Sequence, residues 1–327
     1  MTRRALELPA AAFLAVSLLS RGEAAAGSAL PDLARSARSH ALGDGGALLS
    51  GVHALGENPA ALATGSPELL SQFQRLPLDT FFSALGFAQP LGTSGGTLAP
   101  SYATLRSGSF DGRDASGRRT GEFSHEEHLV GLHGAFKVEQ LSVGAGLKRF
   151  ELRVGSFRSR AYGADVGARY RLEDAPVSLA VCAINLGAGG EQDAALPRRL
   201  VVAAAGEVAG AVSLAASYGY RPLDRTGDLS LGTELRLGPA FALRARYSVA
   251  AGVEAGAQGV AAGIGFNPVP SLAFDYGFDP LPRAVRAAGE AGTHRVTLSY
   301  RFAAAERPVE RKRQRPYWDQ YWRVGGQ

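Results

Sequence analysis

Strict alternation of apolar and polar residues in the segment 295–302 constrains the fold more than any other feature of this sequence. Val296, Leu298, Tyr300 and Phe302 would point to one face of a β-strand, and the arginines, threonine and serine among them to the other. An apolar face that ends in an aromatic residue is typical of a strand that crosses a membrane in a β-barrel. A half-buried strand of a soluble sheet alternates too, so the interpretation depends on how often the pattern recurs.

The alternating pattern recurs about fourteen times between Ser66 and Phe302. The expected strands span 66–74, 78–90, 96–107, 125–138, 140–153, 158–171, 175–187, 197–208, 210–222, 227–238, 240–251, 257–268, 270–280 and 292–302. The first is ambiguous, because Ser66 and Pro67 could instead begin a short helix. No run of 18 or more apolar residues occurs beyond the N-terminus, so no helical membrane span is expected. The sequence thus predicts an all-β fold, an antiparallel transmembrane β-barrel of about fourteen strands.

The connections between these segments alternate in length. Short ones fall near 91–95, 138–140, 173–176, 209–211, 238–240 and 268–271, and the intervening ones are mostly longer, notably 107–125, 187–197 and 281–291. Barrels of the bacterial outer membrane have short periplasmic turns and longer outer loops. We therefore expect an outer-membrane location with both ends of the barrel in the periplasm.

Charged residues fall on one face of the expected strands. A Lys or Arg that faced lipid at mid-bilayer would cost about 2–4 kcal/mol, so this face should line the lumen. Hairpin neighbours should bring Glu234 opposite Arg244 or Arg246. The expected lumen charges are Asp165, Arg169, Glu234, Arg236, Arg244, Arg246, Asp275, Arg295 and Arg301.

The first 26 residues have the pattern of a secretory signal peptide. Arg3 and Arg4 precede an apolar stretch, and Ala24–Ala26 offers a cleavage site. We expect a signal peptide at 1–26, an N-terminal hatch or plug at 27–65, the barrel at 66–302 and a basic, aromatic periplasmic tail at 303–327. The hatch does not alternate. It is rich in glycine, and Asn58 before Pro59 should cap a short helix.

The hatch also carries the clearest resemblance to a known family. The segment 37–63, ARSHALGDGGALLSGVHALGENPAALA, resembles the start of PorV/PorQ outer-membrane proteins, which are similar to FadL-type transporters. The hatch motif residues are Gly45, Gly46, Ala47, Asn58, Pro59 and Ala60. Further matches, in the family's order, are Asn185-Leu186-Gly187, Leu196-Pro197, Gly232-Thr233-Glu234-Leu235, Ala242-Leu243-Arg244, Phe274-Asp275-Tyr276 and Gly292-Thr293-His294-Arg295. The resemblance implies a fourteen-stranded barrel with a small hatch inside.

The same resemblance implies two different functions. PorV-like members bind cargo signal domains in type IX secretion, which would make this protein a non-enzymatic barrel acting through protein contacts in secretion or outer-membrane assembly. FadL-like members pass hydrophobic molecules through a wall opening, which would make it a passive channel. A charged, plugged lumen favours the first function, and the expected cluster of Glu234, Arg236, Arg244, Arg246 and Asp275 makes it our main interpretation. A largely apolar lumen with a gap near Pro100 would favour the second.

Pro100 lies in an expected strand, where it removes a ladder hydrogen bond. Either the strand begins after Pro100 or bulges there, or Pro100 marks a local kink in the barrel wall.

The tail combines a basic run with aromatic residues. Arg311, Lys312 and Arg313 precede Trp318 and Trp322, the two tryptophans of the chain. This composition suits contact with outer-membrane lipid or with a periplasmic or secretion-system protein. A disordered tail is the alternative.

No residue pattern indicates an enzyme. His125-Glu126-Glu127-His128 lacks the spacing of a zinc protease, and we interpret it as the end of a solvated loop. The single cysteine, Cys182, lies in an expected strand among small and apolar residues and should pack there. A net charge of +5 is too small to indicate nucleic-acid binding. We therefore expect no catalytic residues, no cofactor and no metal, with lipid, a partner protein or a hydrophobic ligand as binding partners.

Overall fold

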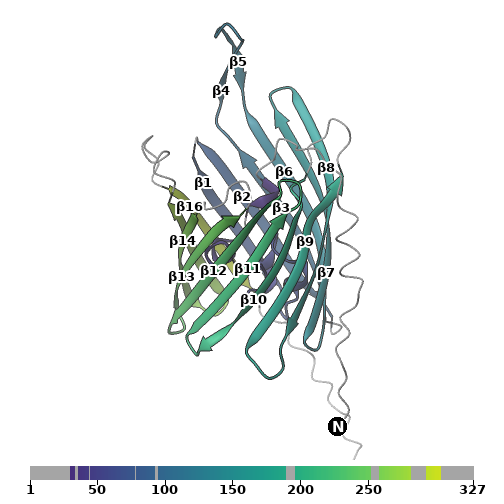
Figure 1. Ribbon diagram of the computed structural model, residues 1–327, viewed down its shortest axis with the longest axis vertical. Coiled ribbons are helices and arrows are strands. Elements are labelled where there is room, and N and C mark those ends of the chain that lie inside the picture. Colours follow the sequence, from purple (N-terminus) through teal and green to yellow (C-terminus); the bar gives the residue numbers. More distant parts are fainter. Residues whose placement is uncertain are drawn as a thin grey trace, which may run out of the picture.

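The computed structural model of the protein describes residues 30–33, 36–43, 45–77, 79–92, 95–188, 196–251, 258–280 and 292–302. Fourteen of the described strands form one closed antiparallel barrel (Figure 1). They are β1 (Glu68–Leu76), β2 (Thr80–Leu91), β3 (Gly96–Arg106), β6 (His125–Val138), β7 (Leu141–Val154), β8 (Phe157–Arg171), β9 (Val177–Ala188), β10 (Arg199–Ala209), β11 (Val212–Arg221), β12 (Thr226–Leu237), β13 (Phe241–Ala251), β14 (Gln258–Val269), β15 (Leu272–Pro280) and β16 (Gly292–Arg301). β1 pairs with β16 from Glu68–Arg301 to Arg75–His294 and closes the barrel. The predicted barrel is confirmed.

One hairpin was not predicted from the sequence. β4 (Phe110–Arg113) and β5 (Arg119–Phe123) form a separate two-stranded sheet that projects beyond the barrel (Figure 1). All five residues of β5 are exposed, so no alternation marks it as a strand. The segment 107–125 was therefore predicted as a loop.

Alternate residues of the barrel strands face opposite sides of the wall. On β12, Leu231 and Leu235 are 51% and 37% exposed, whereas Glu234 is 2% exposed. The apolar face therefore lies outside, toward the membrane, and the charged face lies inside. This arrangement follows from the cost of placing charge in lipid.

The two rims of the barrel differ in their connections. The chain enters β1 at Glu68 and leaves β16 at Arg301 on one rim, which we call the short-turn rim; its turns include 139–140, 210–211 and 238–240. The opposite, long-loop rim carries the 107–124 connection, although β7 and β8 are joined there by only Gly155 and Ser156. That the short-turn rim faces the periplasm stays a prediction.

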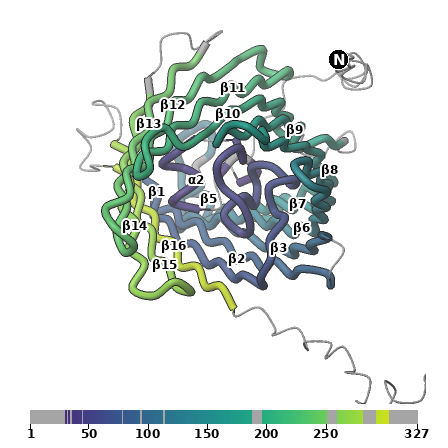
Figure 2. Tube along the Cα trace, turned by 90° about the horizontal axis from the view of Figure 1, so that it is seen from below, coloured from purple at the N-terminus to yellow at the C-terminus, as the bar shows by residue number. Residues whose placement is uncertain are grey.

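The N-terminal segment lies inside the barrel (Figure 2). Its elements are η1 (Leu30–Asp32), α2 (Ala37–Leu42), η2 (Gly51–Ala54) and η3 (Pro59–Leu62), where η marks a 3₁₀-helix. No helix in the described ranges is long and apolar enough to cross a membrane. The small hatch predicted inside the barrel is therefore confirmed as part of the fold.

Local signals fix the ends of the hatch helices. The Ser36 side chain accepts hydrogen bonds from the N–H groups of Arg38 and Ser39, and Gly43 ends α2 with a φ of +56°. Asn58 caps η3 by accepting from Ala60 N–H, with Pro59 in the first helical turn. These are the residue types that favour such caps.

Glycines in the wall let the hatch approach the strands closely. A Cβ at Gly144 of β7 would lie 2.4 Å from the Pro59 carbonyl carbon, and a Cβ at Gly232 of β12 would lie 2.0 Å from the Leu42 carbonyl oxygen. Both distances are shorter than any side chain tolerates. The glycines scattered through the strands are thus partly a requirement of the plugged lumen.

Candidate functional site in the barrel lumen

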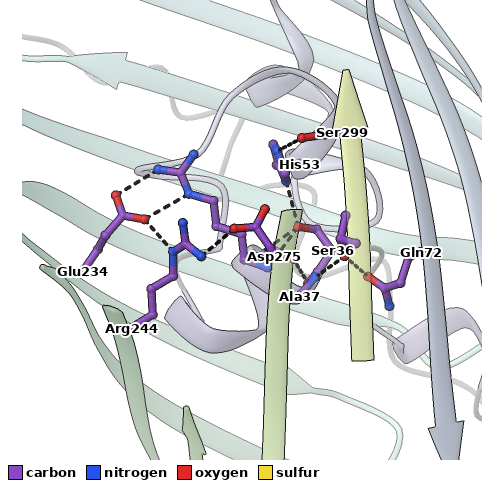
Figure 3. A network of polar contacts seen from close by, with 11 residues as sticks. Ser36, Ala37, His53, Gln72, Glu234, Arg244, Asp275 and Ser299 are labelled. Atoms are coloured by element: carbon purple, nitrogen blue, oxygen red, sulfur yellow. Dashed lines mark hydrogen bonds and ion pairs between the residues drawn. The ribbon is translucent and has the colours of Figure 1, made fainter. Parts of the chain in front are cut away.

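An ionic cluster ties α2 to the wall (Figure 3). Arg38 donates to both carboxylate oxygens of Glu234, at 3.0 and 2.9 Å. Arg244 donates to Glu234 at 2.6 Å and to Asp275 at 2.6 Å. The Glu234, Arg244 and Asp275 side chains are 4% exposed or less. Each of these charges is therefore balanced by an ion pair instead of by water.

Neutral hydrogen bonds extend this cluster toward β1 and β16 (Figure 3). His53 Nδ1 lies 2.8 Å from Ser36 Oγ, and its Nε2 lies 3.1 Å from Ser299 Oγ. The Ala37 N–H donates to Thr297 Oγ1 at 2.8 Å. Burial lowers the pKa of His53 to about 4, so the ring is neutral at pH 7.

The far side of α2 contacts a second ion pair of the wall, between Asp279 and Arg295. His40 Nε2 lies 2.6 Å from Asp279 Oδ1, and Arg295 donates to the other oxygen of Asp279 at 3.1 Å. Burial lowers the pKa of His40 to about 3, although its contact with Asp279 acts in the opposite direction. His40 is therefore neutral at pH 7 as well.

A third polar cluster lies beneath η3. Lys148 Nζ lies 2.7 Å from Asp165 Oδ1, and Asp165 accepts the Asn185 N–H at 2.8 Å. Asn185 has a φ of +59° at a β-bulge between β8 and β9, and its amide donates to the Pro197 carbonyl at 2.8 Å. The bulge thus brings the Asn-Leu-Gly and Leu-Pro segments of the sequence into contact.

The two parts of the hatch motif touch each other. A Cβ at Gly46, whose φ is +78°, would lie 2.5 Å from the Asn58 Cβ. The motif therefore forms one packed unit, with Ala47 and Ala60 fully buried.

Most predicted lumen charges lie inside, but at different depths. Arg246 is 3.9 Å from Asp279, and Arg169 donates to the Leu49 carbonyl at 3.0 Å. Arg236 and Arg301 lie at the short-turn rim, where their side chains are 41% and 62% exposed. No pattern in the sequence predicted the lumen contacts of five further residues, Arg38, His40, His53, Lys148 and Asn185.

Two apolar clusters line the lumen along β2 and β3 and reach onto β6–β8. Toward the long-loop rim, one cluster consists of Leu30, Phe82, Ala84, Ala103, Leu105, Leu129, Phe150, Ala161 and Leu196. Deeper in the barrel, a second consists of Val52, Ala54, Leu55, Ala61, Leu62, Leu70, Ala88, Ala99 and Ala135. Both clusters include inward-facing residues of β2 and β3, so an apolar strip follows these two strands. It is interrupted on β3 by Ser101, whose Oγ lies 3.4 Å from His133 Nε2.

The ladder between β2 and β3 is interrupted beside this strip, at Pro100. β2 and β3 keep one register on both sides of the interruption, but no pairing joins Phe87 and Ala88 to Ala99 and Pro100, although all four residues are described. The ladder between β3 and β6 continues through Pro100. Proline has no N–H to donate to β2, which explains a local break without a register shift. The strand begins at Gly96, so it neither starts after Pro100 nor bulges there.

Two cavities lie on opposite sides of α2. One of about 640 Å³ opens among the short turns and is lined by Arg38, His53 and Glu68. The other, of about 250 Å³, is lined by His40, Arg199 and residues near the long-loop ends of β11 and β12. The hatch therefore separates two cavities in the ionic half of the lumen.

The remaining candidate groups are structural. His125 Nε2 lies 2.7 Å from buried Glu127, which also accepts the Leu30 N–H at 3.0 Å. Cys182 is buried and its thiol donates to the Glu57 carbonyl at 3.1 Å. No group of three or more His, Cys, Asp or Glu in the described part of the chain is arranged to hold a metal. The tail residues Arg311, Lys312, Arg313, Trp318 and Trp322, and the signal segment 1–26, lie outside the described residues.

The fold is similar to that of the P. putida toluene transporter TodX. The TM-score is 0.58 at 14% identity, over 81% of this chain and 97% of TodX. A TodX deltaS2S3 mutant, a monoaromatic hydrocarbon channel, gives 0.54 at 11% identity over 77% and 94% of the two chains. The deltaS2 mutant gives 0.52 at 12% identity over the same shares. No family model matches the chain. No curated protein matches it in sequence.

At these identities the likeness shows the fold alone, a closed β-barrel like that of TodX. Membership of the PorV/PorQ family is not shown.

Proposed function

We propose that this protein is a FadL-like passive channel for hydrophobic small molecules in the outer membrane. The observation that carries the proposal is the interruption between β2 and β3 at Pro100, which lies directly beside an apolar cluster of the hatch. If polar side chains lined the inner side of such a break, an apolar molecule could not leave the lumen there without losing favourable contacts. Here the inward residues at the gap, Ala88 and Ala99, are small and apolar.

The apolar strip supplies a route to this gap. Phe82 and Ala84 of β2 and Ala103 and Leu105 of β3 face the lumen between the long-loop rim and Pro100. A hydrophobic molecule that follows them stays out of contact with the ionic half of the lumen. Moving along apolar side chains avoids the free-energy cost of exposing the molecule to water.

Leu55 of the hatch closes the route at its inner end. A Cβ on Gly86 of β2 would lie 2.0 Å from Leu55 Cδ1, so this leucine fills the space behind the gap. Passage therefore requires a small displacement of the segment around η2.

TodX is named a toluene transporter, which makes toluene a suitable probe. Uptake of labelled toluene should be compared between cells that carry the wild type, Pro100→Val or Pro90→Val. Valine at position 100 restores the N–H, which should allow β2 and β3 to pair and reduce uptake to the level of cells without the protein. Pro90 already lies within the paired part of β2, so Pro90→Val is the matched control. Unchanged uptake with a folded Pro100→Val variant would contradict the proposal.

A second candidate function is a PorV/PorQ-type role in secretion or outer-membrane assembly through protein contacts. The β4–β5 hairpin favours it, because it projects from the rim with Arg119 and Glu122 exposed (Figure 1). Cross-linking in intact membranes tests this role. A partner protein captured by the wild type and lost when 110–123 is deleted would support it.

A further inference from the structure

A cluster of arginines lies on the outer surface of the barrel, on β7 and β8 next to the long-loop rim. Arg149, Arg153 and Arg160 surround Glu151 at 3.1, 2.6 and 3.5 Å, and Arg158 lies opposite Arg153 in the β7–β8 ladder. We call these five residues the outer arginine cluster. It has four positive charges and one negative charge, and Glu126 of β6, opposite Arg153 in the β6–β7 ladder, adds a second negative charge beside it.

The residues of this cluster face outward. Lys148, Phe150 and Leu152 alternate with them on β7 and point into the lumen, where Phe150 is fully buried in the apolar cluster that Leu152 covers. The Arg149, Arg153 and Arg160 side chains are 49%, 42% and 54% exposed. These guanidinium groups are therefore on the surface of the barrel that the surrounding lipid contacts.

The cluster begins where the apolar band ends. Leu141, Val143 and Leu147 are exposed on the outward face of β7, and Arg149 is the next outward residue. The eight residue steps from Leu141 to Arg149 span about 27 Å along the strand, or about 20 Å along the barrel axis at the usual tilt. A membrane barrel's apolar band is about 25 Å tall, so the arginine side chains reach the level of the lipid headgroups.

Aromatic residues mark the same level. Tyr162 is 62% exposed and lies opposite Arg149 in the ladder, and Tyr102 stands outward on β3, hydrogen-bonded to His128 at 2.8 Å. Tyrosines gather at the interface between lipid tails and headgroups in membrane barrels. The cluster thus lies at a headgroup layer, away from the centre of the membrane.

The opposite side of the barrel has no such feature. The outward faces of β10 to β15 carry no Lys, Arg, Asp or Glu among their described residues. A concentration of positive charge on one side of the wall, at one depth, needs an anion to balance it. Guanidinium groups bind phosphate oxygens in pairs and with favourable geometry.

We infer that the outer arginine cluster is a binding site for the phosphate groups of a phosphorylated glycolipid in the outer leaflet. Glu151 orients Arg149, Arg153 and Arg160, and these guanidinium groups together with Arg158 form the positive surface that would bind the phosphates. This inference is independent of what the lumen transports.

The test uses purified full-length protein in detergent and native mass spectrometry with bisphosphorylated lipid A as the probe. Arg158→Gln/Arg160→Gln keeps Arg149 and Arg153 beside Glu151, and should weaken lipid A binding at least tenfold. Arg75→Gln is the matched control, because Arg75 is 55% exposed near the same rim, on β1 away from the cluster. Heat-modifiable migration on a gel verifies that each variant is folded.

Two further measurements decide the chemistry of the ligand. Dephosphorylated lipid A should bind the wild type as weakly as lipid A binds the double variant. Phosphatidylglycerol should compete poorly, because it offers a single phosphate. Equal affinity of wild type and double variant for lipid A would overturn the inference. Equal affinity of the wild type for lipid A and phosphatidylglycerol would overturn the assignment to a glycolipid.

Discussion

The two halves of the lumen wall contact the same hatch by different physical means. β12 to β16 hold α2 through ion pairs and directed hydrogen bonds, as in the contact of Arg38 with Glu234. β2 and β3 contact the hatch mainly through small and apolar side chains, such as Leu55 against Gly86. Ion pairs fix position and angle, whereas apolar contacts are non-directional.

This difference separates anchoring from passage. The ionic half keeps the hatch in one orientation within the barrel. The apolar half offers a surface along which a hydrophobic molecule can move, and only this half adjoins the interruption at Pro100. A hatch anchored on one side can yield locally on the other without leaving the barrel.

The largest expected effect comes from breaking the anchor. Arg244→Ala leaves Glu234 and Asp275 buried with one fewer cation, which should lower the free energy of unfolding by about 3–5 kcal/mol. Urea titration in lipid vesicles measures this loss. Arg236→Ala is the control, because its ion pair with Glu207 is exposed and should contribute about 0.2–1 kcal/mol. Equal losses would mean that the ionic half does not anchor the hatch.

A smaller effect on stability, with a distinct effect on transport, is expected for Leu55→Ala. Removing this buried side chain should cost about 3 kcal/mol and open space behind the gap, so toluene uptake should rise. Leu42→Ala removes an equally buried leucine from α2, in the ionic half. It should cost a similar free energy and leave uptake unchanged. A rise in uptake in both variants would show that any loosening of the hatch increases transport, and would contradict a route specific to the apolar half.

Acid should loosen the anchored half. The pKa values of His40 and His53 are lowered to about 3 and about 4 in the folded hatch, from 6.5 when exposed. As the pH falls, both histidines therefore take up a proton in the displaced hatch before they do so in the folded hatch. The free energy that holds the hatch in place is full above pH 6.5 and decreases as the pH falls toward 4. At pH 5.5 each histidine should favour opening by roughly tenfold. Hydrogen exchange of α2 amides, corrected for intrinsic rates, measures this opening. His40→Gln/His53→Gln should be insensitive to pH between 7 and 5.5.

The smallest expected effect concerns the hatch motif itself. Asn58→Ala removes the cap of η3 and should cost about 1 kcal/mol. Asn58→Ser keeps a capping oxygen and should recover most of that loss. A difference in chemical unfolding midpoint between the two variants measures the contribution of the cap.

Much of the wall was predictable because alternation and register act locally. The pairing of Glu234 with Arg244 follows from a two-strand hairpin, in which these residues lie directly opposite each other. The fourteen strands were found within a few residues of their ends for the same reason.

The hatch contacts were not predictable in this way. Arg38 and His53 lie in short helices without periodicity, and their partners are about 200 or more residues away in the chain. Asn185 gains its role through a β-bulge, which no alternation reveals. Pro100 was visible in the sequence, but whether it begins, bulges or interrupts a strand depends on its neighbour β2.

A reversible lock across the interruption tests most directly whether molecules leave the barrel there. Ala88→Cys/Ala99→Cys in a Cys182→Ser background places two thiols on opposing inward positions of β2 and β3 at the interruption and keeps Pro100. Leu85→Cys/Tyr102→Cys, at a paired position of the same ladder, is the control. We expect oxidation to stop toluene uptake only in the 88–99 variant, and reduction to restore it. Undiminished uptake through the oxidised 88–99 variant would contradict a lateral route at Pro100.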